Sequence, residues 1–227
     1  MNSPLVTYTE ISPNQSARSS PISFIVAHCV VGQCTIEALG HLFAERSRAA
    51  SSNYGIDKDG RVGCFVDEST GRSWCSSSSW LDDRGVTIEC ASDVTAPWAF
   101  RDCVYEKLVE LCVDICKRNG KTKLLWLGDK ETTLNYKPAS DEMLLAVHRW
   151  FANKACPGDW LMDRMDDLAS RVTQNLSPEE PSDWARVSCQ KAVEKGVVQG
   201  YGDGRYGWRD NITREQLIVM LDRLGML

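Results

Sequence analysis

The sequence has little of three features that would each indicate a class of protein: basic charge, long apolar runs and histidine. Its 227 residues include 26 Lys and Arg against 31 Asp and Glu, and the net charge of −5 argues against a protein that tracks nucleic-acid phosphates. No apolar run approaches the roughly 20 residues of a membrane span. Residues 1–30 also show no basic segment followed by an apolar one, as a secretion signal would. We therefore expect a soluble protein made in the cytosol, with neither nucleic acid nor a membrane as partner.

Cysteine, in contrast, is abundant, with 10 Cys beside only 3 His. Several cysteines fall inside apolar stretches, such as Cys64 in VGCFV, Cys90 in TIECA and Cys112 in LCVDIC. A chain of this length buries a sizeable core without disulfide staples, so these residues are expected to be buried free thiols in a reducing compartment. The scarce histidines are the better candidates for a specific task.

The predicted elements of residues 1–174 alternate between strands and helices, which indicates one α/β domain with helices on the faces of a sheet. Apolar residues recur at spacings of three and four within Trp98–Asn119, which makes this the clearest helix. The segment MLLAVH fits a strand or a helix. The expected elements are a strand within residues 21–31, a helix over Thr35–Ala49, a hairpin within Ser52–Asp67, strands at Arg72–Cys75, Gly85–Ser92 and KLLWLG, and a last helix over Gly158–Gln174.

Residues 175–182, NLSPEEPS, have the composition of a linker. Residues 183–227 then form a small unit, with a predicted helix over Asp183–Lys195, the glycine-rich stretch GYGDGRYG, and a second helix. Thr213 and Gln216 have the spacing of a capping box at the start of that helix. Two short helices bury little surface, so we expect this unit to pack on another surface.

Two histidines and one cysteine have the composition of a metal site. His28 ends the apolar strand IVAH, and His148 lies eight residues before Cys156 in HRWFANKACPGDW. Two imidazoles and a thiolate make up the protein share of a catalytic zinc site, whose fourth position is left to water, although iron or copper also suits these ligands. The alternative is that all three are buried core residues. Lys154, close to Cys156, and the rigid turn CPG favour the metal site.

Residues 21–170 resemble the type-2 N-acetylmuramoyl-L-alanine amidases, a zinc-dependent family that includes muropeptide amidases, peptidoglycan recognition proteins and phage endolysins. The family strand IVIH is here IVAH, and the family motif K-x-C/D-P-G is here KACPG. The segments NYGIDKDG, RSWC and VTIE follow the family order between them. Two accessory histidines of the family are replaced by Asn53 and Cys75. The endolysins of phages of clostridia and related Gram-positive bacteria resemble the chain most.

This resemblance implies a single mixed β-sheet flanked by helices and a hydrolase that cleaves the amide between N-acetylmuramic acid and L-alanine. One zinc ion would be held by His28, His148 and Cys156. Glu89 would act as general base and acid, and Lys154 would stabilise the oxyanion. Family positions that line or support the substrate groove are occupied by Tyr54 and Trp74, for which buried packing is the alternative.

Residues 183–227 resemble one S-layer homology motif, through Trp184-Ala185, GVVQGYGDG and ITREQ. In that family the module binds secondary cell-wall polymers, which are anionic carbohydrates, and Arg214 at a helix N-terminus is a sensible ligand for them. Trp184 and Asp203 would complete the groove or its turn. Such motifs usually come in threes, so a single copy also implies self-association, packing on the amidase, or a vestigial anchor.

Two other functions compete with the amidase. Receptors of the same fold bind peptidoglycan without cleaving it, but they usually lack the third metal ligand, which is present here as Cys156. A thiol peptidase could use Cys156 with His148, but its cysteine normally opens a helix rather than preceding Pro-Gly. For the amidase we expect residence in the host bacterial cytoplasm until lysis releases the enzyme to the wall.

Overall fold

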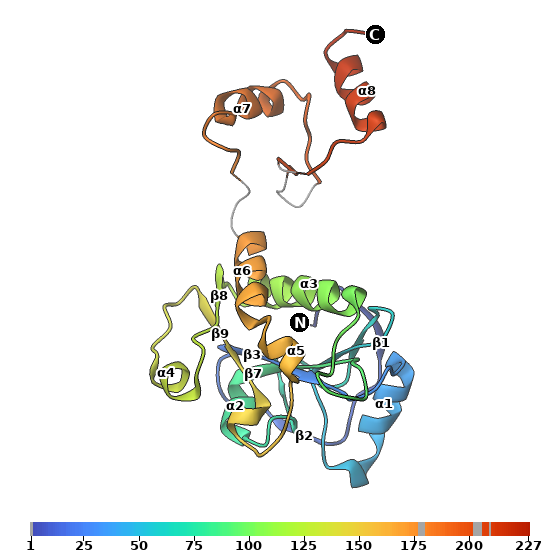
Figure 1. The fold of residues 1–227 in the computed structure, drawn as a ribbon, viewed down its shortest axis with the longest axis vertical. Coiled ribbons are helices and arrows are strands. Elements are labelled where there is room, and N and C mark those ends of the chain that lie inside the picture. The colour runs from blue at the N-terminus through green and yellow to red at the C-terminus, as the bar shows by residue number, and fades with distance from the viewer. Residues whose placement is uncertain (1, 177–179, 202–205, 209) are drawn as a thin grey trace. The chain divides into compact units, whose positions relative to one another are not determined.

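The computed structural model describes residues 2–176, 180–201, 206–208 and 210–227, which belong to two compact units, Met1–Leu176 and Ser177–Leu227 (Figure 1). Among these residues, no helix has both the length and the apolar character needed to cross a membrane. The first unit contains the strands β1 (Val6–Thr9), β2 (Gln15–Ala17), β3 (Phe24–Cys29), β4 (Tyr54–Ile56), β5 (Val62–Cys64), β6 (Gly71–Ser73), β7 (Gly85–Cys90), β8 (Lys123–Leu125) and β9 (Glu142–Ala146). Its α-helices are α1 (Ile36–Ala44), α2 (Ser79–Arg84), α3 (Asp102–Arg118), α4 (Lys130–Asn135), α5 (Asp159–Met162) and α6 (Met165–Leu176), and its 3₁₀ turns are η1 (Arg46–Arg48) and η2 (His148–Trp150).

A mixed seven-stranded sheet in the order β1-β5-β4-β7-β3-β9-β8 forms the centre of the first unit, as the predicted fold class requires. All its neighbours pair in parallel except β4 and β5, which form the predicted hairpin. A separate two-stranded sheet joins β2 to β6. The central strand β3 is buried along its whole length, consistent with its continuous apolar sequence.

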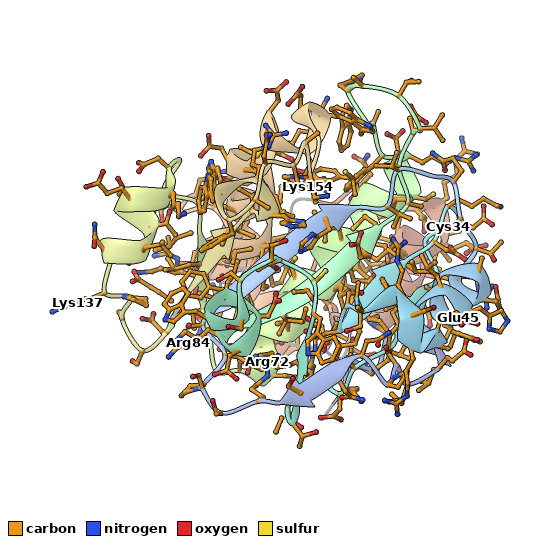
Figure 2. The ribbon with its side chains drawn as sticks, turned by 90° about the horizontal axis from the view of Figure 1, so that it is seen from below. Cys34, Glu45, Arg72, Arg84, Lys137 and Lys154 are labelled. Atoms are coloured by element: carbon orange, nitrogen blue, oxygen red, sulfur yellow. The ribbon has the colours of Figure 1, made fainter. Side chains whose placement is uncertain are left out.

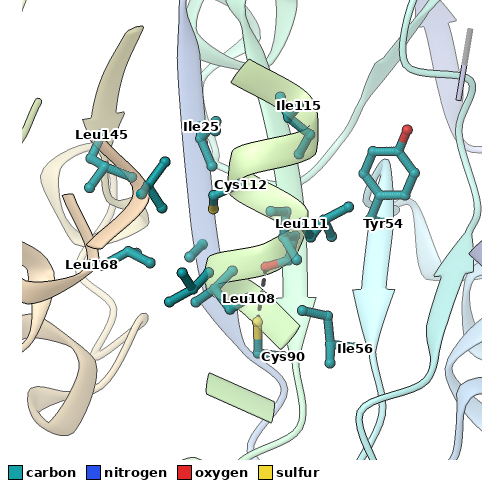
Figure 3. Close-up of a cluster of buried hydrophobic side chains, with 14 of the residues drawn as sticks. Ile25, Tyr54, Ile56, Cys90, Leu108, Leu111, Cys112, Ile115, Leu145 and Leu168 are labelled. Carbon is teal, nitrogen blue, oxygen red and sulfur yellow. Dashed lines mark hydrogen bonds between the residues drawn. The ribbon is translucent and has the colours of Figure 1, made fainter. Parts of the chain in front are cut away.

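Helices cover both faces of the sheet. On one face α3 and α6 pack together, and α3 presents its apolar stripe to strand residues such as Ile25 and Ile56 (Figure 3). Ile36, Leu39 and Phe43 of α1 form a smaller cluster with Phe65 on the other face. Because side chains alternate along a strand, β3 directs Ile25 and Ala27 toward the first cluster and directs His28 to the opposite face.

Several elements differ from the sequence-based expectation. The first helix ends at Ala44, so the predicted tail to Ala49 is instead the turn η1, after which Ala49 has a φ of 49°. MLLAVH contributes strand β9, and the predicted last helix is divided into α5 and α6. Asn175 and Leu176, expected in the linker, are the last residues of α6. The sequence analysis missed β1, β2, α2 and α4.

The second unit contains α7 (Arg186–Glu194) and α8 (Arg214–Arg223). Helix α7 begins three residues later than expected. Thr213 and Gln216 form the predicted capping box, with each side chain bound to the backbone of the other residue. Neither helix has a buried residue. Large apolar side chains of α8 are about half exposed, among them Leu217, Ile218 and Val219.

Candidate metal centre and substrate grooves

His28 and Glu89 lie side by side at the carboxyl ends of two adjacent parallel strands. The register of β3 and β7 pairs His28 with Glu89, and the alternation of each strand sends both side chains to the face opposite α3. The carboxyl edge of a parallel sheet is a common position for a binding site. The strand β9, on the other side of β3, ends at Ala146, and His148 follows almost at once in η2.

The structure brings the three predicted metal ligands together. The ligand atoms of His28, His148 and Cys156 all lie within 4.8 Å of one another. The Sγ atom of Cys156 is 3.3 Å from Nδ1 of His28, and the two imidazole rings have centroids 5.2 Å apart. Two nitrogens and a sulfur at this spacing match the ligand set that zinc prefers.

Serine hydroxyls hold the ring nitrogens that face away from this cluster. The Oγ atom of Ser76 lies 3.3 Å from Nε2 of His28, and Ser77 Oγ lies 2.7 Å from Nε2 of His148. An imidazole nitrogen that bonds a partner outside the metal site fixes the ring orientation, as outer partners do in known metal sites. The two serines belong to the run SSSS, residues 76–79.

The protonation states favour neutral imidazoles. Burial, aided by the neighbouring His148, lowers the pKa of His28 to about 3. Burial and the charge of Lys154 also lower the pKa of His148. Neutral imidazole is the form that binds metals. A hydrogen bond with the Cys29 thiol, together with burial, raises the pKa of the Cys156 thiol, so a thiolate here needs a cation beside it.

Glu89 has one unsatisfied buried oxygen beside the ligand cluster. Its Oε1 accepts a weak hydrogen bond from the Cys75 thiol at 3.7 Å, while Oε2 is buried without a partner. Burial raises the pKa of Glu89 to about 7. A carboxylate whose pKa lies near neutrality and whose free oxygen faces a metal cluster is suited to proton transfer.

Cys75, which stands where the family has a histidine, belongs to a second possible ligand group with His28 and Glu89. Burial, followed by the nearby carboxylates of Glu89 and Asp82, raises the pKa of its thiol well above the usual value. The group of His28, His148 and Cys156 offers two imidazoles and a sulfur, whereas the second group offers a single imidazole. The first group is therefore the better zinc site.

Two grooves meet at this cluster, and both are lined by Phe43, Arg48, Glu89, His148 and Lys154. We call the first the serine groove; it has a volume of about 560 Å³, and its other lining residues include Arg72, Trp74, Ser77, Ser78 and Ser79. We call the second the apolar groove; it has a volume of about 510 Å³, and its other lining residues include Val31, Leu39, Leu42 and Trp98. Figure 2 labels Arg72, which lines the serine groove, and Lys154, which lines both grooves.

Lys154 is exposed at the junction of the two grooves, and the structure gives its side chain no partner among the described residues. An ammonium group with no competing ion pair is available to a substrate oxygen. Trp74 is 39% exposed and lines the serine groove, and its indole nitrogen donates to the Ser16 hydroxyl at 2.9 Å. Its predicted contact with substrate stays a prediction.

The structure corrects the prediction that Tyr54 contacts substrate. Tyr54 is fully buried, and its hydroxyl accepts from the backbone nitrogen of Ser3 and donates to the Glu68 carboxylate at 2.8 Å. Glu68 in turn binds Arg118 through two hydrogen bonds. The hydroxyl is therefore used inside the core, on the side of the sheet where α3 packs.

Of the predicted wall-binding residues, the two that the structure describes, Trp184 and Arg214, make no hydrogen bond or ring contact with each other. Trp184 is 90% exposed, and Arg214 is exposed at the first position of α8. Asp203 lies outside the described residues.

Sequence reasoning missed several residues around the centre. Asp82 is buried and accepts hydrogen bonds from the backbone nitrogens of Cys75 and Ser76, which fixes the loop that holds His28. Its position in the short helix α2 gave no signal. Trp98 and Arg48 were expected at the ends of predicted helices, but Trp98 lies in the loop before α3 and Arg48 in η1, and from there they line the grooves.

Comparison with known proteins agrees with this geometry. The family model described as N-acetylmuramoyl-L-alanine amidase matches residues 18–159, which include His28, Glu89, His148 and Cys156. A model of the S-layer homology domain matches residues 181–218. No curated protein sequence matches the chain.

Solved structures of similar fold cover most of the first unit at low identity. The selenomethionine derivative of AmpD is 18% identical, with a TM-score of 0.51 over 71% of this chain and 93% of that one. The N-acetylmuramoyl-L-alanine amidase LysC from Clostridium intestinale is 16% identical, with a TM-score of 0.52 over 74% and 94%. The Staphylococcus aureus hydrolase AmiA, solved with its ligand, is 11% identical, with a TM-score of 0.52 over 78% and 85%. At these identities the likeness shows the fold.

Proposed function

Because the chain belongs to the N-acetylmuramoyl-L-alanine amidase family, we propose that it hydrolyses the amide bond between N-acetylmuramic acid and L-alanine in peptidoglycan, with one zinc ion as cofactor. The observation that carries this proposal is the cluster of His28, His148 and Cys156 beside the unpartnered Oε2 of Glu89. A recognition protein needs no proton acceptor next to its metal ligands, whereas a hydrolase does.

The donor set and its surroundings fit a zinc ion. His28, His148 and Cys156 would hold it, with the two imidazoles neutral and their outer nitrogens bonded to serines. When bound, the ion supplies Lewis acidity and lowers the pKa of water from about 15.7 toward about 7. This chemistry explains why a thiol is placed among imidazoles in a buried cluster.

Glu89 and Lys154 provide the proton transfer and the charge stabilisation. Glu89 Oε2 takes the proton from the attacking water and delivers it to the nitrogen of the leaving alanine. Lys154, exposed at the junction of the grooves, donates to the carbonyl oxygen as negative charge develops there. A preorganised donor of this kind contributes about 3–4 kcal/mol to the lowering of the barrier.

The direct test is a chelation and restoration assay on purified Gram-positive walls, with free N-terminal alanine as the product measured. The protein as isolated should release alanine, lose this activity with a chelator and regain it with zinc, and metal analysis should find about one zinc per chain. Release that persists in metal-free protein would contradict the zinc proposal. Wall binding without alanine release would identify a recognition protein instead.

We also propose that the S-layer homology motif retains the enzyme at the wall through a secondary cell-wall polymer. Arg214 is exposed at the N-terminus of α8, where a guanidinium and backbone nitrogens together suit an anionic polymer. Self-association through the exposed apolar residues of this unit is the alternative use of the same surface.

The resemblance of the motif set to clostridial phage enzymes supports a further proposal, that the chain is an endolysin of Gram-positive bacteria. Such an enzyme stays in the host cytoplasm until lysis brings it to the wall. Expression in a Gram-positive host should leave cells intact until a membrane pore is opened, and lysis before that point would contradict this localisation.

A further inference from the structure

The serine groove and the apolar groove meet at the reaction centre and differ in chemistry. Glu89, His148 and Lys154 line both, so a substrate cleaved between these residues extends one half into each groove. In the proposed reaction the two halves also differ. One is an N-acetylated sugar with a lactyl ether, which has apolar ring faces and methyl groups, and the other is a peptide with carboxylates.

The apolar groove has exposed apolar walls that are held in place by the backbone. Val31 is 48% exposed, Leu42 is 37% exposed and Trp98 is half-buried. Val31 has a φ of 61° and Trp98 a φ of 59°, a conformation that β-branched and bulky residues rarely adopt. Strain of this kind persists only where the surroundings enforce it, and it concentrates at ligand sites.

Hydrogen bonds fix both strained residues. The backbone nitrogen of Val31 donates to the Ser92 hydroxyl at 3.1 Å, and the Ser92 nitrogen donates to the Gly32 carbonyl at 3.1 Å. The Trp98 nitrogen donates to the Thr95 carbonyl at 2.8 Å. Two loops from distant parts of the chain are thus braced so that their apolar side chains line one groove. An indole face held beside the reaction centre is a stacking surface for a sugar ring.

The serine groove carries the opposite chemistry. Arg72 lines this groove and not the apolar one, whereas Arg48 lines both. The Nε atom of Arg72 is buried without a hydrogen bond. A guanidinium group with a hydrogen-bond donor to spare, among serine hydroxyls, suits carboxylates and peptide amides.

We propose that the glycan half of the substrate occupies the apolar groove, with Trp98 stacked on the sugar ring, and that the peptide half occupies the serine groove. This inference rests on the proposed amidase function and gives the substrate a direction across the site. The reverse direction would place peptide carboxylates against Val31, Leu42 and Trp98, where desolvation is costly, and would leave the unbonded Nε of Arg72 without a peptide carboxylate to bind.

The test compares the zinc-loaded wild-type protein with Trp98→Leu on three soluble substrates: an N-acetylmuramoyl peptide, the same peptide carrying only the D-lactoyl group, and the N-acetylmuramoyl peptide with its second-residue carboxylate converted to carboxamide. Wild type should favour the first substrate over each of the others by about tenfold in kcat/KM, the effect of one lost stacking or charged contact. Trp98→Leu should lose the preference for the sugar and keep the preference for the carboxylate.

Matched variants separate this role from a structural one. Trp80→Leu removes another exposed tryptophan, 44% exposed and outside both grooves, and should keep both preferences. Val31→Asn introduces a polar residue that tolerates the positive φ at this position, and it should reduce the sugar preference as Trp98→Leu does. In the serine groove, Arg72→Gln should reduce the carboxylate preference, whereas Arg46→Gln, outside both grooves, should not.

The outcomes distinguish this inference from the proposed function. The assigned direction would be overturned if Trp98→Leu lowered kcat/KM equally on all three substrates. It would also be overturned if this variant lost only the preference for the carboxylate and kept the preference for the sugar. Absence of hydrolysis by wild type would overturn the amidase function while leaving the direction testable, since calorimetric affinities of Glu89→Gln for the same three compounds report the same preferences. Equal affinities for all three in that variant would again overturn the direction.

Discussion

The Sγ atom of Cys156 lies 3.3 Å from Nδ1 of His28, although the two residues are 128 positions apart in the chain. The contact depends on strand β3, which fixes His28 at its carboxyl end, and on the turn before α5, which carries Cys156. A thiol sulfur and an imidazole nitrogen are both zinc ligands, and the lowered pKa of His28 keeps its imidazole neutral. The pair is therefore the core of the proposed zinc site.

Substitution of either residue should therefore remove the metal. We expect Cys156→Ser and His28→Ala to lower zinc affinity by more than about 100-fold, since loss of a direct ligand exceeds the 10–100-fold cost of losing an outer partner. Metal content after dialysis against a competing chelator measures this. Cys103→Ser, which removes an exposed thiol away from the cluster, is the control and should bind zinc as wild type does. Retention of zinc by Cys156→Ser would place the metal elsewhere.

Substitution of Glu89 or Lys154 should have a different effect, because neither is a proposed ligand. Glu89→Gln keeps the shape of the side chain but removes the proton acceptor, and Lys154→Ala removes the donor at the groove junction. Each should lower the rate of alanine release by at least about 100-fold while zinc content stays at one per chain. Lys137→Ala, on an exposed lysine outside both grooves, should leave the rate unchanged. Wild-type rates in either test variant would exclude its assigned role.

The residues that the structure brings together were easier to identify from the sequence than several of the elements around them. Strand β3 and helix α3 carry long apolar patterns, so His28 and the core face of α3 were identifiable. The strand β2 and the helix α4 are short and polar, and they form because tertiary contacts hold them, which leaves no local signal.

The grooves could not be derived from sequence for a related reason. Val31, Arg48 and Trp98 come from loops and a single 3₁₀ turn, and only the closed fold brings them beside Lys154. The burial of Tyr54 was equally hidden, since an aromatic residue in a short strand fits both a core and a groove.

The corrected position of Tyr54 has a measurable consequence. Tyr54→Phe would leave the Ser3 nitrogen without its buried partner and would remove one of the hydrogen bonds to Glu68 Oε2, which keeps its bond from Arg118; this should lower the free energy of unfolding by about 1–3 kcal/mol. The value of kcat/KM should change less than about twofold, because the hydroxyl reaches no groove. Urea denaturation and steady-state kinetics on the same samples check both statements. Tyr136→Phe, at a 39% exposed residue, is the control for stability. A large rise in KM for Tyr54→Phe would restore the substrate role.

Asp83 provides a pH-dependent contribution to stability. Hydrogen bonds from the Ser20 hydroxyl and from Ser19 lower the pKa of Asp83 to about 2, against about 3.9 in an unfolded chain. A lowered pKa in the folded state means that the carboxylate stabilises the fold above about pH 4, and that this contribution is lost as the pH falls through about 2.

Asp83→Asn should accordingly be less stable than wild type by roughly 1–2 kcal/mol at neutral pH, and the difference should shrink between about pH 4 and pH 2. The trend can be measured from the urea unfolding midpoints of Asp83→Asn and wild type at pH 7, 5, 4 and 3. Asp163→Asn, at an exposed carboxylate with no side-chain partner in the described structure, should show no such trend. A difference between Asp83→Asn and wild type that stays constant with pH would show that the carboxylate charge is not the stabilising feature.

The second unit should be separable from catalysis. Residues 2–176 contain the whole sheet and its main apolar cluster, so a chain ending at Leu176 is expected to fold and to release alanine from soluble muropeptides at the wild-type rate. Its retention on purified walls should fall by at least about tenfold if the S-layer homology motif anchors the enzyme, and Arg214→Ala in the full chain should lower retention in the same direction. Size-exclusion chromatography of both chains separates anchoring from assembly.

Equal retention of both chains on the wall would contradict the anchoring role of the S-layer homology motif. A larger oligomer formed only by the full chain would then assign the exposed apolar residues of α8 to self-association.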